Sequence, residues 1–119
     1  MKKILIVDDE PGILMSLEFL MKKEGYEIFI ARDGREAIEI VKNESPSALI
    51  LDIMMPEVDG FEVCEFIKGN EKTSHIKVIF LTAKSKDSDI QKGLAAGADL
   101  YLTKPFSTKE LVKKVNEIL

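Results

Sequence analysis

Three carboxylates, a hydroxyl and an ammonium group stand at the ends of short apolar runs in this sequence. They belong to Asp8, Asp9, Asp52, Thr82 and Lys104. Taken singly, each has an ordinary structural explanation, such as a helix cap, a turn residue or a solvated charge. Taken together, they form a set that could bind a divalent cation and take part in phosphoryl transfer. The set can act only if the fold brings these side chains to one place.

The chemistry of such a set follows from charge. Converging carboxylates repel each other unless positive charge lies among them, and Lys104 supplies one such charge. Mg²⁺ suits the rest, because it binds carboxylates, waters and phosphate oxygens. Zinc is not indicated, since His75 lies alone in a predicted loop and Cys64 lies inside a predicted helix. In this arrangement Asp52 would attack phosphorus, Lys104 would offset the developing charge, and Thr82 would donate a hydrogen bond.

Short apolar runs and longer amphipathic stretches alternate along the chain. The runs have the length and composition of strands buried on both faces of a sheet. They are Lys3–Val7, Tyr26–Ala31, Ala48–Leu51, Lys77–Leu81 and Leu100–Thr103. The stretches between them predict helices over Pro11–Glu24, Asp33–Asn43, Asp59–Lys68, Asp87–Ala95 and Ser107–Leu119. Strands joined through helices are parallel, so we expect a doubly wound α/β domain with a five-stranded parallel sheet.

This architecture explains why the polar residues should meet. The carboxyl ends of parallel strands lie at one edge of the sheet, and ligands bind at that edge near a topological switch point. The strand that ends at Ala31 is followed by Arg32 and Asp33, which is typical of an ordinary helix start. The other four strand ends deliver the chemically active set to one rim.

Composition limits the classes of function. A chain of 119 residues fits one domain, so we expect a single domain over residues 1–119 with no output domain. A net charge of −4 argues against a nucleic-acid-binding surface. The single cysteine, Cys64, cannot form an intramolecular disulfide, which favours a cytoplasmic location. The apolar run Ile4–Val7 is too short for a signal peptide or a membrane span.

Two other phosphate chemistries fit the pattern less well. A dinucleotide-binding domain needs a glycine-rich first loop, whereas residues 8–12 are mainly acidic and would repel phosphates. A phosphatase of the haloacid dehalogenase type also uses a strand-end aspartate with Mg²⁺. It has a second aspartate two residues later, where this chain has Met54, and it carries a cap domain that this chain lacks.

The chain resembles the receiver (CheY-like) domain of bacterial two-component response regulators over residues 2–119. The resemblance is carried by residues 4–11 (ILIVDDEP), 49–60 (LILDIMMPEVDG), 80–83 (FLTA) and 101–106 (YLTKPF). In order, these segments resemble the acidic metal pocket, the phosphoacceptor strand with its loop, the switch threonine, and the switch aromatic with the catalytic lysine. The fold implied by the resemblance is flavodoxin-like, (βα)5, with strand order 2-1-3-4-5.

The resemblance implies a role for each matching residue. Asp52 is the phosphorylated aspartate. Asp9 and Asp52 bind Mg²⁺ through their carboxylates, Asp8 chiefly through water, and Met54 through its backbone carbonyl. The chain would therefore catalyse its own phosphorylation and dephosphorylation, without being an enzyme that acts on other substrates.

The remaining matches concern catalysis and switching. Lys104 and Thr82 complete the catalytic set, and the Lys104–Pro105 peptide bond is expected to be cis. On phosphorylation, Thr82 moves toward the phosphate and Tyr101 turns inward. This biases the face formed by the last strand and the last two helices between two states.

A sensor histidine kinase is the phosphoryl donor that the resemblance implies. The predicted helix Pro11–Glu24 carries more apolar residues than one buried face needs. Leu17 and Met21 fit the core row, and we expect some of the others to be exposed as a kinase-docking patch, extended by the Lys104–Phe106 loop. Those others are Ile13, Leu14, Met15, Phe19 and Leu20. The alternative is that these are scattered surface hydrophobes, which are common.

The output is not specified by the residues. It is either a protein target or an output domain outside this chain, with no direct nucleic-acid or membrane binding. Leu100 and Lys114 replace an acidic residue and an arginine found in receivers of winged-helix regulators, so we expect a monomer or weak dimer. A receiver-like module that binds partners without phosphorylation is the alternative function. Such a module would lack a residue of the acidic pocket, Thr82 or Lys104, and none is missing.

Overall fold

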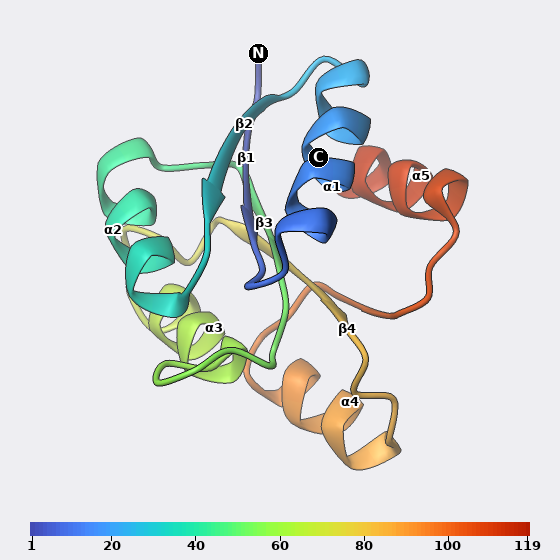
Figure 1. Ribbon diagram of the computed structural model, residues 1–119. Coiled ribbons are helices and arrows are strands. Elements are labelled where there is room, and N and C mark those ends of the chain that lie inside the picture. The colour runs from blue at the N-terminus through green and yellow to red at the C-terminus, as the bar shows by residue number, and fades with distance from the viewer.

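The computed structural model describes residues 1–119 as a three-layer α/β/α domain (Figure 1). Its strands are β1 (Lys3–Val7), β2 (Glu27–Ala31), β3 (Ala48–Leu51), β4 (Lys77–Thr82) and β5 (Leu100–Thr103). Its helices are α1 (Pro11–Lys23), α2 (Gly34–Glu44), α3 (Gly60–Lys68), α4 (Asp87–Ala95) and α5 (Thr108–Ile118). All strand pairs are parallel, in the order β2-β1-β3-β4-β5. The predicted fold class and strand order are confirmed.

Each element lies within one residue of its predicted bounds, and the shifts at three helix starts have a common cause. Asp33, Asp59 and Ser107 stand just before α2, α3 and α5 in extended backbone conformation, and each side chain accepts a hydrogen bond from the backbone N–H three residues later. These residues are therefore N-caps, which satisfy a free helix donor without being helical themselves. The predicted ranges of these helices include the cap residues and therefore begin one residue early.

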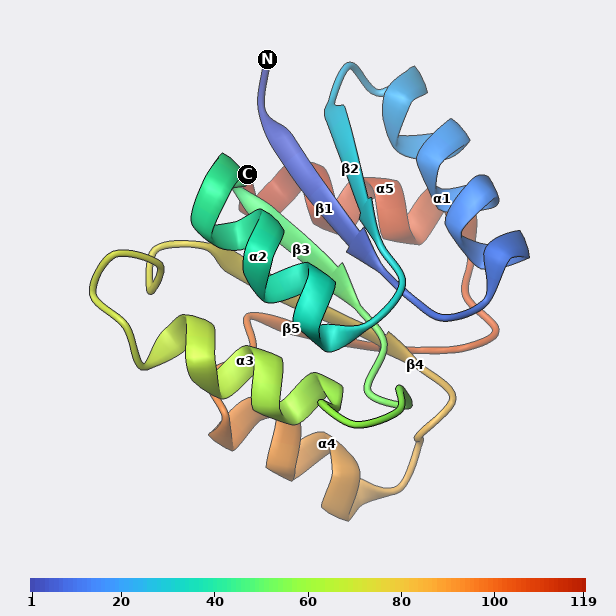
Figure 2. The same ribbon diagram turned by 60° about the vertical axis from the view of Figure 1, so that its left-hand side comes forward.

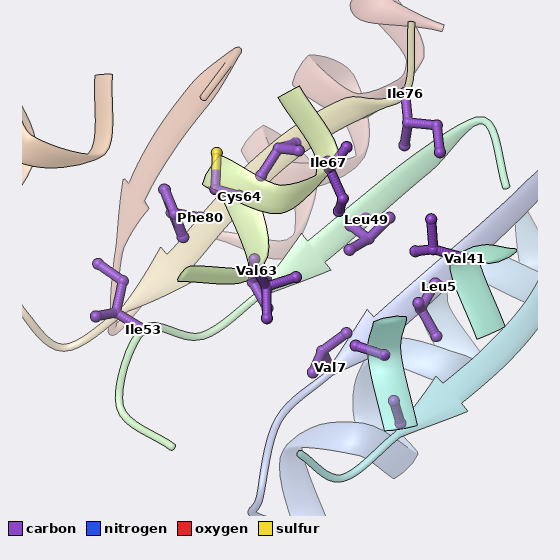
Figure 3. Close-up of a cluster of buried hydrophobic side chains, with 14 of the residues drawn as sticks. Leu5, Val7, Val41, Leu49, Ile53, Val63, Cys64, Ile67, Ile76 and Phe80 are labelled. Atoms are coloured by element: carbon purple, nitrogen blue, oxygen red, sulfur yellow. The ribbon is translucent and has the colours of Figure 1, made fainter. Parts of the chain in front are cut away.

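The hydrophobic core forms two layers because side chains alternate along each strand. In β1, Leu5 and Val7 face α2 and α3, whereas Ile4 and Ile6 face α1 and α5. Figures 1 and 2 show these helix pairs on opposite faces of the sheet, with α4 on the α3 side. Figure 3 shows part of the first layer, where side chains of α3 meet those of the central strands.

Strands buried on both faces were expected throughout, and this expectation is wrong for the two edge strands. Most residues of β2 and all residues of β5 are only partly buried. In the strand order, β2 and β5 lie at the two edges, where each has one neighbour. The apolar composition of an edge strand resembles that of a central strand, so composition alone did not separate them.

The two chain ends lie at the same end of the molecule, opposite the carboxyl ends of the strands (Figures 1 and 2). The Lys2 ammonium group donates a hydrogen bond to the Leu119 backbone oxygen there. No helix combines the length and apolar composition that crossing a bilayer requires.

The thiol of Cys64 should be unreactive in the native protein. Cys64 is fully buried in α3 (Figure 3), and burial raises the pKa of its thiol to about 11. The reactive thiolate is then scarce at mildly alkaline pH. We expect a disulfide reagent to react on the order of 100-fold more slowly with the native chain than with the denatured chain. The rate of thiol modification can be followed by absorbance, and equal rates for the native and the denatured chain would contradict the burial of Cys64.

Candidate functional site

The register of the two central strands places two carboxylates side by side. Val7 of β1 lies opposite Leu51 of β3, and the backbone N–H of Asp52 donates to the Val7 carbonyl at 3.0 Å. The residues that follow, Asp8 and Asp52, are therefore neighbours at the rim of the sheet. Both are nearly inaccessible, with exposed fractions of 2% and 5%.

The turns after the strands hold one oxygen of each carboxylate. Asp8 Oδ1 accepts a hydrogen bond from the backbone N–H of Glu10 at 3.0 Å, and Asp52 Oδ1 accepts one from Met54 N–H at 3.1 Å. These bonds satisfy acceptors that water cannot easily reach. They leave the Oδ2 atoms of both residues free for a cation.

Lys104, which follows the edge strand β5 at the same rim, supplies that cation. Its Nζ lies 3.0 Å from Asp8 Oδ2 and 3.3 Å from Asp52 Oδ2. Burial acts to lower the pKa of Lys104, but the hydrogen bond to Asp8 and the charge of Asp52 outweigh it, so the pKa lies above its ordinary value. Lys104 therefore stays charged at neutral pH and compensates two buried negative charges.

A larger acidic cluster surrounds this ion pair. Asp8, Asp9, Glu10 and Asp52 each offer a carboxylate oxygen, and these oxygens lie within 4.8 Å of one another. Asp9 and Glu10 are exposed, so a bound cation could keep several waters. Hard oxygen donors at a partly open rim fit Mg²⁺. His75 and Cys64 do not belong to this cluster.

Glu10 is a member of the cluster to which the sequence pattern gave no role. Its Oε1 lies 3.9 Å from Lys104 Nζ, so Lys104 faces three carboxylates rather than two. The run of three acids after β1 was a signal for this placement. Whether the Glu10 side chain points toward Lys104 depends on the direction of the turn, which composition does not provide.

Met54 and Asp9 line an open groove beside the acidic cluster, together with residues of α3 and α4. Met54 is 53% exposed, which leaves it at the mouth of the site.

The first residue of α3, Gly60, lies directly against the backbone of Asp52. A Cβ at Gly60 would lie 2.5 Å from the Asp52 carbonyl oxygen. A glycine is therefore required for α3 to close over the backbone of the strand end.

Thr82 and Tyr101 both contact the backbone of Lys84. Thr82 is fully buried and its Oγ1 accepts a hydrogen bond from Lys84 N–H at 3.3 Å. The Tyr101 hydroxyl donates to the Lys84 carbonyl at 2.7 Å. Burial, with smaller contributions from Asp89 and Asp52, raises the pKa of Tyr101 to about 12, so the hydroxyl remains a donor at neutral pH.

Lys104 is tied to the same rim through its backbone, because its N–H donates to the Thr82 carbonyl at 2.8 Å. The Lys104–Pro105 peptide bond is cis. The structure thus brings Asp8, Asp52 and Lys104 into direct contact, adds Asp9 to their cluster, and fixes Thr82 on the adjacent strand.

The apolar patch expected on α1 is smaller than the sequence suggested. Met15 and Phe19 are 71% and 69% exposed, whereas Leu14 is buried with Leu17 and Met21. Ile13 and Leu20 are partly buried against the second core layer. Phe106 lines a groove that also contains Ile90 and Tyr101.

The sequence matches the profile of the response regulator receiver domain over residues 4–116. This chain belongs to that family. The receiver domain is a signalling module of response regulators and histidine kinases, rather than an enzyme acting on metabolites.

Solved structures agree with this assignment. A putative response regulator from Chloroflexus aurantiacus J-10-fl is 36% identical, with a TM-score of 0.93 over 98% of this chain and 96% of that chain. Chemotaxis protein CheY4 of Vibrio cholerae is 31% identical, with a TM-score of 0.93 over 100% and 99% of the two chains. The receiver domain of the sensor histidine kinase PA1611 from Pseudomonas aeruginosa PAO1, described with a magnesium ion coordinated in its active-site cleft, is 28% identical, with a TM-score of 0.89 over 98% and 95%.

Removing the ammonium group should destabilise the domain. In Lys104→Met, two buried carboxylates lose their counter-ion, and we expect a loss of about 2–3 kcal/mol in the free energy of unfolding near neutral pH. Added Mg²⁺ should restore part of it, because a cation that binds the folded state stabilises that state. Urea unfolding with and without Mg²⁺ measures both effects.

The matched control is Lys114→Met. Lys114 pairs with Glu110 at 3.7 Å on the exposed surface of α5, and such a pair contributes at most about 0.5 kcal/mol. If the two variants lost equal stability, the compensation assigned to Lys104 would be wrong.

Proposed function

We propose that this chain is a phosphorylation-dependent switch. It accepts a phosphoryl group from a sensor histidine kinase onto Asp52 in a Mg²⁺-dependent reaction, and it signals through the face formed by α4, β5 and α5. The observation that carries this proposal is the position of Lys104 Nζ, 3.0 Å from Asp8 and 3.3 Å from Asp52, beside the acidic cluster.

The reaction follows from these groups. A carboxylate oxygen of Asp52 attacks phosphorus, an O–P bond forms, and the bond from phosphorus to the donor nitrogen breaks, with the nitrogen keeping the electron pair. Lys104 offsets negative charge on a phosphoryl oxygen, and the Thr82 hydroxyl donates a hydrogen bond to another. In hydrolysis a water oxygen attacks phosphorus, the bond from phosphorus to Asp52 breaks with the carboxylate keeping the electron pair, and inorganic phosphate and a proton leave to solvent.

Mg²⁺, when bound, would neutralise charge on the phosphoryl oxygens. Asp9 and Asp52 would hold it through carboxylates, Asp8 through water, and Met54 through its backbone carbonyl. Two observations support this assignment: the four clustered carboxylates of this chain, and the magnesium ion in the active-site cleft of the Pseudomonas aeruginosa relative.

The switch would use Thr82 and Tyr101. Both are already bonded to the backbone of Lys84, so a movement of Thr82 toward a phosphoryl group alters the surroundings of Tyr101. Helix α4 is suited to respond, because Gly93 is its one buried residue. An element that buries little apolar surface can shift at low cost.

The kinase would dock on α1 and on the Lys104–Phe106 loop. Met15 and Phe19 support this part of the proposal, since both are large, apolar and mostly exposed on the helix that begins beside the acidic rim. The downstream partner is a protein target or an output domain that reads the α4–β5–α5 face.

Phosphorylation is tested by intact mass after incubation with Mg²⁺ and either acetyl phosphate or phosphoramidate, which presents a P–N bond like that of phosphohistidine. We expect the parent chain to gain one phosphoryl group and Asp52→Asn to gain none. Asp33→Asn is the matched control, because Asp33 caps α2 outside the acidic cluster and asparagine also caps helices well. No gain in the parent with either donor or with a kinase would favour the phosphorylation-independent binding module.

Metal binding is tested separately by isothermal titration calorimetry with Mg²⁺. We expect Asp9→Asn to weaken Mg²⁺ binding by at least about 10-fold, because it removes a charged oxygen donor from the cluster. Asp33→Asn should bind like the parent. Unchanged affinity in Asp9→Asn would remove Asp9 from the metal site while leaving the role of Asp52 open to the mass measurement.

A further inference from the structure

Helix α4 packs on the sheet through a residue that has no side chain. Gly93 is buried and lies against two aromatic rings. A Cβ at this position would stand 2.8 Å from Tyr101 Cδ2, 2.9 Å from Tyr101 Cε2 and 3.2 Å from Phe80 Cδ2. Carbon atoms in packed interiors do not approach to 2.8 Å. A side chain at position 93 and the present orientation of Tyr101 are therefore incompatible.

Of the two rings, Tyr101 is the one that can move. Phe80 is fully buried, and its ring packs between Phe61 and Tyr101 with centroid separations of 5.8 and 5.7 Å. Tyr101 lies on the edge strand β5 and is only partly buried. It also borders the open groove that contains Ile90 and Phe106, so its ring has space beside it that Phe80 lacks.

The orientation that Gly93 permits connects Tyr101 to the switch threonine. The Tyr101 hydroxyl donates to the Lys84 carbonyl at 2.7 Å, and the Lys84 N–H donates to Thr82 Oγ1 at 3.3 Å. If a methyl group at position 93 displaced the Tyr101 ring, the hydrogen bond to the Lys84 carbonyl would lengthen or break, because such bonds weaken steeply with poor geometry.

We propose that Gly93 is a positioning residue for Tyr101: the missing side chain at this position is what allows the orientation in which the Tyr101 hydroxyl reaches the Lys84 carbonyl. The inference rests on the proposed function, since it concerns how the switch is transmitted. A side chain at 93 would keep the Tyr101 ring out of this orientation whether or not Asp52 carries a phosphoryl group. Phosphoryl transfer and its readout on α4 and β5 would then be uncoupled.

Helix propensity and the steric clash predict opposite changes in stability for Gly93→Ala. Glycine inside a helix is unfavourable, so Gly→Ala in α4 should stabilise the protein if helix propensity alone mattered. The chain contains a control glycine in Gly12, in the first turn of α1, where a Cβ would meet no atom within 4 Å. Gly12→Ala reports the propensity effect without a steric one.

The test uses NMR of the chain labelled with ¹³C at the tyrosine ε positions. The chain has two tyrosines, Tyr26 and Tyr101, and Tyr26→Phe assigns the remaining signal. In the unphosphorylated parent and in Gly12→Ala, the Tyr101 signal should carry the ring-current shift of the neighbouring Phe80. In Gly93→Ala it should move toward the value of free tyrosine. A Tyr101 signal unchanged in Gly93→Ala would overturn the proposal.

The free energy of unfolding provides a second test of the contact between position 93 and Tyr101. Gly93→Ala should be less stable than the parent when Tyr101 is present, and it should become stabilising, like Gly12→Ala, in a Tyr101→Ala background. If Gly93→Ala does not fold, recovery of folding in the double variant supports the proposal. Failure of the Tyr101→Ala background to relieve the effect overturns it.

Phosphoryl uptake separates this inference from the function on which it rests. Gly93→Ala should gain a phosphoryl group to the same extent as the parent, because Asp52 and Lys104 are unaltered. If the parent gains none, the proposed function is wrong, while the NMR comparison on unphosphorylated chains still decides the role of Gly93.

Discussion

Two aspartates are held side by side, almost without access to water, because β1 and β3 pair in register and end at the same level. Like charges in that position are unfavourable unless a cation lies between them. The cation comes from Lys104, which follows the last strand, so the acids are compensated only when β4 and β5 have joined the sheet. The ion pair at the site therefore depends on the complete sheet. The exposed acids at the same rim leave the site short of positive charge, which a divalent ion would supply.

The elements around the site differ in how deeply they are buried. The central strands are buried on both faces and fix the positions of Asp8, Asp52 and Thr82 to within the tolerance of a packed core. Helix α4 and the edge strand β5 bury much less. The two buried aspartates are therefore held by the central strands, whereas β5 carries Tyr101 and, with α4, is suited to movement that needs a small energy gap.

Most of the fold was predictable because each central strand is a short, uninterrupted apolar run and three of the helices follow a recognisable N-cap residue. The strand ends then indicated Asp8, Asp9, Asp52, Thr82 and Lys104 as a candidate site, and Asp8, Asp52 and Lys104 are in direct contact. Other features depend on distances between elements and could not be predicted. The contact of Glu10 with Lys104 depends on the direction of one turn, and the fit of Gly93 against Tyr101 depends on how α4 lies on β5. Burial of Leu14 beside exposed Met15 depends on the rotation of α1 about its axis.

The place of the two chain ends has a consequence for how this domain can be built into larger proteins. Both ends emerge on the side remote from the acidic rim, next to each other (Figures 1 and 2). A polypeptide tethered at either end would leave the approach to Asp52 unobstructed. The same unit can therefore precede, follow or interrupt another module without rebuilding its reactive edge.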